Sequence, residues 1–311
     1  LVKRYQSLVG GLLWLQRHTR PDISTAVSLL SCYSHNPSAG HYEAAKRVLS
    51  YLQGTLDRGI RFTQGGAPVS VNVSFPTDDG TYTDANWGPQ DASHPTTDEA
   101  TVTIGEVQSL LGHVVFRMGG PVCWGCSREK GTVSRSSCES EIYATDEGTK
   151  SALTIRNLLF DFGFTDGTDP SPVWNDNRGC VDWTKGVSVS KKLRHINMRE
   201  LGVCLAQQNG LVNIQHIDGK RNIADLFTKE IKDSQHFQAM AFTITTPRLL
   251  VDMDIPHHES LAVNKGGVEL SETWIKPMTS MTSSWLSPLV STAIKAVTRL
   301  PTALRGTRVS M

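Results

Sequence analysis

The feature that most constrains the fold is a tight turn between two strand-like runs. Residues 110–118 are apolar enough for a central strand, and a Gly-Gly-Pro sequence at 119–121 leads directly into a second run, 122–127. Such a short connection favours antiparallel neighbours. A third run, 81–87, precedes them and carries Asp84 among aromatic residues. The pattern predicts an antiparallel start to a sheet, with a carboxylate on its first strand.

The chain before this sheet predicts a helical unit. Residues 3–54 form three helical patterns, the first with an apolar stripe through Tyr5 and Leu12, and Gly54 ends the third. Gly, Pro, Ser and Val dominate 65–76, which indicates a linker. The net charge of the 311 residues is only +1, but residues 1–65 contain eight Lys or Arg and three Asp or Glu. This basic surface is either solvated or in contact with a polyanion.

A second carboxylate lies on a predicted helix after the strands. Ser136 and Glu139 have the spacing of a capping box, which gives Glu139 a structural role at the start of the helix. Glu141 lies three residues before Ala144, on the apolar stripe that should face the sheet. A buried carboxylate is costly unless a cation meets it. Glu141 is therefore a candidate ligand.

Two more carboxylates follow further along the chain. Asp176 ends a buried strand pattern, and Asp225 lies near the start of a last amphipathic helix capped by Asn222. Either could instead be an ordinary turn or helix-start residue. His216, on a strand pattern between them, is more often a packed histidine than a catalytic one. The basic residues at the start of another predicted helix favour a phosphate-facing patch over a solvated face; they are Lys191, Lys192, Arg194 and His195.

The carboxylates fall on four successive elements, and we expect them to meet at one edge of the sheet. Four such groups can share a site only if cations lie between them. Oxygen ligands favour Mg²⁺, with Mn²⁺ as an alternative. Two such ions about 3.5–4 Å apart can activate a water and stabilise the leaving oxygen of a phosphodiester. The expected metal ligands are Asp84, Glu141, Asp176 and Asp225.

Several short motifs are distinctive: Tyr5-Gln6-Ser7-Leu8-Val9-Gly10, Arg20-Pro21-Asp22-Ile23, Ala44-Ala45-Lys46-Arg47-Val48-Leu49-Ser50-Tyr51-Leu52, Tyr82-Thr83-Asp84-Ala85-Asn86-Trp87, Ser137-Cys138-Glu139-Ser140-Glu141-Ile142-Tyr143, Asn175-Asp176-Asn177, Arg194-His195-Ile196 and Ala224-Asp225-Leu226-Phe227-Thr228-Lys229. With these motifs, Leu1 to Gly54 resembles the C-terminal end of copia-type LTR-retrotransposon reverse transcriptases. The sequence from there to about residue 230 resembles the RNase H domain that follows it.

The resemblance implies an α/β fold: a five-stranded mixed sheet flanked by helices, its first three strands antiparallel, preceded by a small helical subdomain. It also implies a two-metal endonuclease that cuts the RNA strand of an RNA–DNA hybrid, with the four carboxylates as catalytic and metal-binding residues. The expected partners are the hybrid and the rest of the Pol polyprotein. The residues expected to contact nucleic acid are Arg17, Arg20, Lys46 and Arg47, together with Lys191, Lys192, Arg194 and His195.

The expected organisation is a helical unit at 1–64, a linker at 65–76, an RNase H-like domain at 77–245 and a poorly ordered basic tail at 246–311. The chain opens in mid-pattern, which favours a fragment of a longer protein. No apolar run reaches the ~18 residues of a membrane span. We expect a cytoplasmic location in a virus-like particle, or a nuclear one.

Some features depart from the family pattern. Asn197 and Glu230 stand where the family has Asp and Pro, and the loop at 89–107 differs as well. These changes concern substrate positioning more than metal binding. The polymerase's own Asp-Asp motif would lie upstream of Leu1, so no polymerase activity is expected.

Alternative functions follow from the same residues. The chain could be a decayed or repurposed element that binds nucleic acid without cutting it. An integrase-like transposase is disfavoured because its acidic residues follow a different order. A zinc site at Cys123 and Cys126 is also disfavoured, since residues three apart on a strand point to opposite faces. We interpret all six cysteines as reduced thiols.

Overall fold

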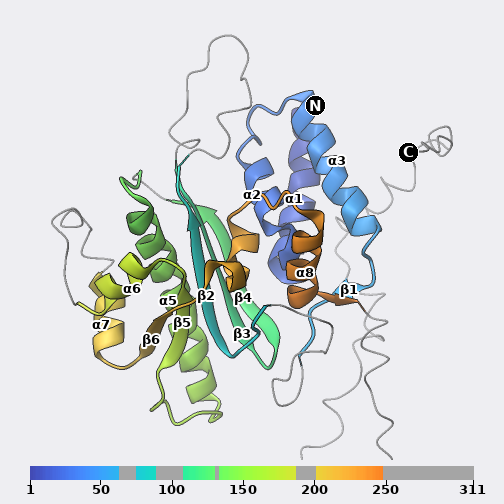
Figure 1. Ribbon diagram of the computed structural model, residues 1–311. Coiled ribbons are helices and arrows are strands. Elements are labelled where there is room, and N and C mark those ends of the chain that lie inside the picture. Colours follow the sequence, from blue (N-terminus) through green and yellow to red (C-terminus); the bar gives the residue numbers. More distant parts are fainter. Residues whose placement is uncertain (63–74, 89–107, 130–132, 187–200, 248–311) are drawn as a thin grey trace, which may run out of the picture.

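The computed structural model describes residues 1–62, 75–88, 108–129, 133–186 and 201–247. Its centre is a five-stranded sheet in the order β4-β3-β2-β5-β6 (Figure 1). Neighbouring strands β2, β3 and β4 are antiparallel, whereas β5 is parallel to β2 and β6 is parallel to β5. This is the mixed sheet that the resemblance implied. The strands are β2 (Gly80–Asn86), β3 (Leu110–Arg117), β4 (Gly120–Arg128), β5 (Ser171–Asn175) and β6 (Val212–His216).

The turn between β3 and β4 consists of two residues, Met118 and Gly119. Their φ angles are 52° and 73°, both in the left-handed region that two-residue hairpin turns require. The sequence pattern had put Met118 in the strand. Its backbone N–H donates to Asp79 Oδ1 at 2.7 Å, a contact that holds this non-glycine residue in the turn.

Helices cover both faces of the sheet (Figure 1). On one face lie α5 (Ser137–Asp161), α6 (Arg178–Thr184) and α7 (Leu201–Gln208). At Gly148, α5 comes so close to β2 that an added Cβ would lie 2.4 Å from Thr83 Cγ2. On the other face, the short 3₁₀ helix η4 (Ile223–Phe227) and α8 (Ser234–Ile244) enclose the largest apolar cluster, which includes Tyr82, Phe116, Phe227 and Met240.

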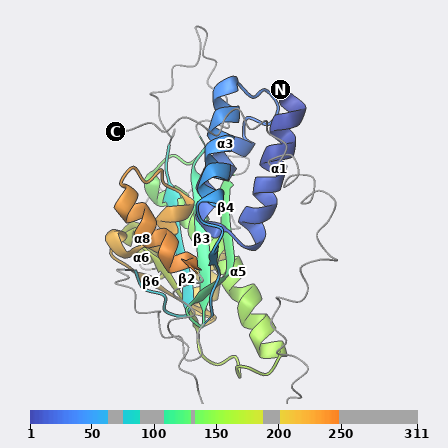
Figure 2. The ribbon, with the colours of Figure 1, turned by 90° about the vertical axis from the view of Figure 1, so that its right-hand side faces the viewer.

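The N-terminal helices form a second core and pack on the same face as α8. They are α1 (Val2–His18), the 3₁₀ turn η1 (Pro21–Ile23), α2 (Ser24–Ser31) and α3 (Ala39–Gln53). Figure 2 shows α1 and α3 in front of β3 and β4. Several contacts join the units; among them, Thr25 Oγ1 donates to the Leu226 carbonyl at 2.6 Å, and Trp124 Nε1 donates to the Gln16 carbonyl at 2.8 Å. The helical unit is therefore attached to η4 and to β4 by polar contacts.

Three further details differ from the sequence-based expectation. Phe75, placed in the linker, is buried in the core with Tyr82 because its ring has apolar neighbours there. Thr246–Pro247, placed in the tail, forms strand β7, which pairs with β1 (Arg58–Gly59). Asn222 caps η4 and not a long amphipathic helix, because Thr228 at its end turns its hydroxyl to Asp84.

Residues 65–74 of the expected linker, the loop at 89–107, Asn197 and residues 248–311 lie outside the described residues. Among the helices that the structure describes, none is long and apolar enough to cross a membrane.

Candidate active site

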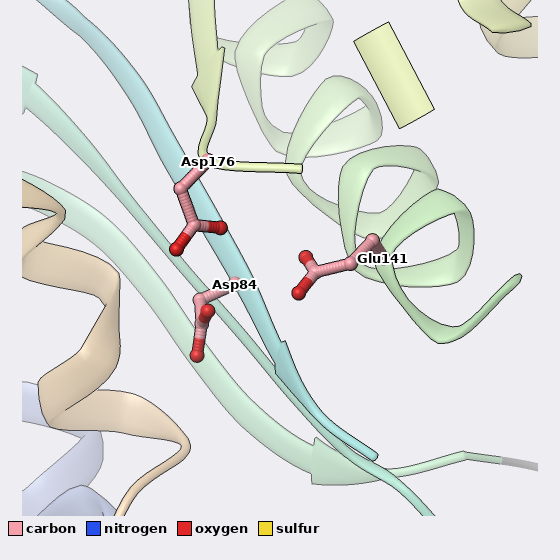
Figure 3. Close-up of side chains that lie close together, drawn as sticks. All are labelled: Asp84, Glu141 and Asp176. Carbon is pink, nitrogen blue, oxygen red and sulfur yellow. The ribbon is translucent and has the colours of Figure 1, made fainter. Parts of the chain in front are cut away.

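Three of the four expected carboxylates meet at the edge of the sheet. One oxygen each from Asp84, Glu141 and Asp176 lies within 4.8 Å of the other two, and Figure 3 shows the side chains pointing toward one shared space. Asp84 is on β2, Glu141 is near the start of α5, and Asp176 directly follows β5. Asp84 and Glu141 are buried, while Asp176 is half-buried.

The register of the sheet creates this meeting point. The last residue of β5, Asn175, pairs with Thr83, so Asp84 lies one residue beyond the end of its parallel neighbour. The chain leaves the sheet at Asp176, and α5 passes over the same edge. The fully buried Asn175 donates from Nδ2 to Glu141 Oε2 at 2.9 Å and to Thr83 Oγ1 at 3.1 Å. This amide therefore fixes Glu141 relative to β2.

Burial and mutual repulsion both act against negative charge in this cluster. Burial, followed by the charge of Asp84, raises the pKa of Glu141 well above the usual range of a glutamate. The same two causes raise the pKa of Asp176. A divalent cation would offset both effects, because it favours the ionised form of each ligand. The donor set consists of hard carboxylate oxygens and fits Mg²⁺ or Mn²⁺.

The fourth carboxylate, Asp225, is linked to the others through a lysine. Lys229 Nζ lies 2.7 Å from Asp225 Oδ1 and 3.2 Å from Asp84 Oδ1. Burial and the charge of Asp84 raise the pKa of Asp225. Burial opposes the charge on Lys229, but the nearby Asp84 and Asp225 outweigh it and raise the pKa of the lysine. Asp225 is thus next to Asp84 but is not part of the three-carboxylate cluster.

Glu139 has the structural role that the sequence predicted, with a shift of one residue. The Ser136 hydroxyl accepts from the Glu139 N–H at 3.2 Å, while Glu139 Oε2 accepts from the N–H of Arg135 at 2.7 Å. Tyr143 donates to the other carboxylate oxygen at 3.2 Å. These contacts occupy both carboxylate oxygens of Glu139, which is not part of the cluster of Asp84, Glu141 and Asp176.

The residues expected to contact nucleic acid fall into three groups. Arg17, Lys46 and Arg47 are exposed on the helical unit, where Lys46 pairs with Glu43 at 2.8 Å. The expectation for Arg20 is wrong. Its guanidinium is buried and binds Asp22 and Thr55, because the turn at η1 brings these partners to it. The third group lies outside the described residues: Lys191, Lys192, Arg194 and His195.

Sequence reasoning missed several polar residues around the cluster. His216 was expected to be packed. In the structure, Ile214 is the last buried residue of β6, and His216 at the end of the strand is exposed. Its charge lowers the pKa of Asp176 against the larger effects of burial and Asp84. Lys229 is the last residue of the motif that contains Asp225. Its position four residues after Asp225 could have indicated an ion pair between them.

A short turn, η3 (Gly219–Arg221), packs against Asp176. A Cβ added at Gly219 would lie 2.9 Å from Asp176 Oδ2, so the turn depends on glycine for this close approach. The next two residues, Lys220 and Arg221, are exposed, as is Arg178 at the start of α6. Exposed cationic residues therefore lie close in sequence to Asp176 and to Gly219, on two elements.

A mixed sheet in this strand order, with carboxylates from β2, α5 and the end of β5 at one edge, has the RNase H-like fold. No family model matches the chain. The retrovirus-related Pol polyprotein from transposon RE2 of Arabidopsis thaliana is 31% identical over 73% of this chain. The chain belongs to the retrovirus-related Pol polyproteins of copia-type transposons, and it spans 14% of the length of RE2.

Two other similar proteins match about half of this chain and most of their own length. The secreted RxLR effector protein 161 of Plasmopara viticola is 35% identical over 49% of this chain and 92% of its own length. Among solved structures, LC11-RNase H1, isolated from compost, is 15% identical and covers 48% of this chain and 90% of its own, with a TM-score of 0.34.

Proposed function

We propose that the chain is the ribonuclease H of a copia-type retrotransposon and hydrolyses the RNA strand of RNA–DNA hybrids. The observation that carries this proposal is the convergence of Asp84, Glu141 and Asp176, from three separate elements, within 4.8 Å. Such a buried group of like charges is unfavourable unless it binds cations. The relationship of the chain to the Pol polyproteins supports an RNA–DNA hybrid formed during reverse transcription as the substrate.

The roles of the residues follow from their positions. Asp84, Glu141 and Asp176 would hold a divalent ion, and Asp225 would contribute to a second. Bound ions of this kind activate a water and stabilise the leaving oxygen of a phosphodiester. Asn175 orients Glu141 through its amide, and the Thr228 hydroxyl orients Asp84.

Exposed cations would hold the phosphates of the hybrid. Lys220 and Arg221 follow the glycine that touches Asp176, and Arg178 lies two residues after that aspartate. Arg17, Lys46 and Arg47 offer further exposed cations on the helical unit. Contacts of this kind position the duplex without reading its sequence. Recognition of a hybrid by shape and by 2′-hydroxyl groups is consistent with such a surface.

The decisive experiment compares cleavage of a labelled RNA–DNA hybrid with cleavage of duplex DNA, in Mg²⁺ and in EDTA. We expect Mg²⁺-dependent cleavage of the RNA strand alone. Asp84→Asn should reduce the rate by at least about a hundredfold, because losing a residue that merely orients a metal ligand already costs about 10–100-fold.

Asp161→Asn is the matched control, since Asp161 is exposed at the end of α5. It should cleave at the wild-type rate. Cleavage that persists in EDTA or in the folded Asp84→Asn variant would exclude the proposed nuclease. Hybrid binding with no cleavage in Mg²⁺ or Mn²⁺ would instead support a binding protein that has lost its activity.

A further inference from the structure

We propose that Lys229 competes with a divalent cation for Asp84 and Asp225, so that the second ion binds only when this lysine moves away. The inference rests on the proposed function, because it assumes that the acidic cluster binds metal. It assigns to Lys229 a positioning role: the lysine makes the two ion sites unequal.

The ammonium of Lys229 lies where an ion shared by Asp84 and Asp225 would lie. Its Nζ is 3.2 Å from Asp84 Oδ1 and 2.7 Å from Asp225 Oδ1, so it bridges the two carboxylates. A magnesium ion would need oxygens at about 2.0–2.1 Å from both residues. The ammonium and the ion would then occupy the same space with like charges.

The first ion does not require the same displacement. Within the described part of the chain, neither Glu141 nor Asp176 forms an ion pair. Asp84 has two carboxylate oxygens with about four lone-pair positions, so it can bind an ion and still accept from Thr228 and Lys229. The cluster of Asp84, Glu141 and Asp176 can therefore fill first.

Lys229 is also free to leave. Its side chain is 40% exposed, whereas the side chains of Asp84 and Asp225 are 1% and 16% exposed. A lysine carries its charge on a flexible four-carbon stem, so the ammonium can move into water while both aspartates stay fixed. The competing group is mobile and the ligands are not.

The test is a titration of the purified chain with Mn²⁺, followed by calorimetry and by the electron paramagnetic resonance signal of free Mn²⁺. In the wild type we expect one ion to bind more tightly and a second to bind at least about tenfold more weakly. Lys229→Met should strengthen the second step by about tenfold or more, because the competing cation is gone. Lys229→Arg, which keeps a cation, should leave the second step weak.

Lys150→Met is the matched control. Lys150 also bridges two carboxylates, at 2.5 Å from Asp146 and 3.1 Å from Glu147, but these lie outside the acidic cluster. This variant loses the same charge and should bind Mn²⁺ as the wild type does. A second step that strengthens equally in both Met variants would mean a general charge effect and would overturn the inference.

The remaining outcomes separate this inference from the proposed function. If two ions bind and Lys229→Met leaves the second step unchanged, the competition is wrong while the metal site stands. If neither the wild type nor Lys229→Met binds Mn²⁺ at millimolar concentration, both the proposed metal-dependent function and the inference about Lys229 are wrong.

A measurement on the wild type covers the case in which Lys229→Met does not fold. The ¹⁵N resonance of the Lys229 ammonium, followed during titration with Mg²⁺, should shift with the second binding step. A signal that shifts fully with the first step, or that does not change while two ions bind, would contradict the competition.

Discussion

At the scale of single residues, the acidic groups are held by partners of different charge. Glu141 accepts a hydrogen bond from the neutral amide of Asn175, whereas Asp84 and Asp225 face the ammonium of Lys229. The amide only partly offsets the burial of Glu141, and the pKa of this glutamate is raised. A raised pKa in the folded state means that folding favours the protonated form.

This shift predicts how stability changes with pH when metal is absent. Above the ordinary pKa of a glutamate, about 4.3, the unfolded chain loses a proton that folded Glu141 retains. In EDTA, the free energy of unfolding should therefore fall as the pH rises from about 5 to 8. Each retained proton contributes at most about 1.4 kcal/mol per pH unit. Urea denaturation at several pH values measures the slope.

Glu141→Gln provides the comparison because glutamine cannot ionise. Its free energy of unfolding should fall less steeply with pH than that of the wild type over the same range. Equal slopes would mean that Glu141 does not carry the effect. Saturating Mn²⁺ should reverse the trend in the wild type, since metal binding requires the ionised carboxylate.

At the scale of elements, local patterns predicted the five strands of the central sheet, the N-terminal helices and α5, and with them the positions of three carboxylates, but they did not predict α8 or the β1–β7 pair. Asp84, Glu141 and Asp176 lie on a strand, on the buried stripe of a helix and at a strand end, and each of these features is visible in a few neighbouring residues. The distant partners of Arg20 and Lys229 were not predictable in this way. Thr55 and Asp84 lie 35 and 145 residues away from them, respectively.

The same limit applies to η4. The apolar residues of this segment indicated an amphipathic helix, but η4 is a single 3₁₀ turn that packs against β3. Tertiary contacts at its end replace further helical turns: Thr228 bonds Asp84, and its backbone carbonyl accepts from Asn86 at 3.3 Å. No local pattern encodes contacts with a strand more than 140 residues earlier.

The close approach of η4 to β3 makes Gly112 a sensitive position. A Cβ there would lie 2.6 Å from Thr228 Cγ2 and 2.8 Å from Phe227 Cβ. Gly112→Ala should therefore lower the free energy of unfolding by about 1–3 kcal/mol, as overpacked cores do. It should also weaken Mn²⁺ binding, because Thr228 and Asp225 would move relative to Asp84.

Gly10→Ala is the control for this substitution. Gly10 lies in the middle of α1 and an added Cβ would meet nothing within 4 Å, so the change should stabilise the protein by up to about 1 kcal/mol. Denaturant unfolding of both variants measures the difference. A Gly112→Ala protein as stable as the wild type, with unaltered Mn²⁺ binding, would show that η4 can shift without consequence.

At the scale of the whole molecule, the helical unit supports the element that carries Asp225. Thr25 on α2 donates to the carbonyl of Leu226, the residue that follows Asp225 in the chain. On the opposite end of η4, Asn222 Nδ2 donates to the Thr83 carbonyl at 2.9 Å. The turn is therefore held between the helices and the central strand.

Thr25→Val tests this connection. Valine has the same shape but cannot donate, so the buried Leu226 carbonyl loses its partner, and we expect a loss of about 1–3 kcal/mol in the free energy of unfolding. Thr154→Val removes a hydroxyl that donates to the Lys150 carbonyl on the exposed face of α5, and it should change stability by less than about 0.5 kcal/mol. Equal effects of the two substitutions would indicate that the Thr25 hydrogen bond stabilises the protein no more than an exposed hydrogen bond within a helix does.

The two-residue pairing of Arg58 and Gly59 with Pro247 and Thr246 has a practical consequence for anyone dissecting this protein. Arg58 also reaches Gln238 on α8 at 2.7 Å and covers the ring of Phe242. A shortened protein that starts after the helices, at residue 75, would lack Arg58 and β1, so α8 and β7 would lose these contacts. A shortened protein should therefore keep Arg58 and the helices before it, and should not begin at the glycine-rich segment 65–76.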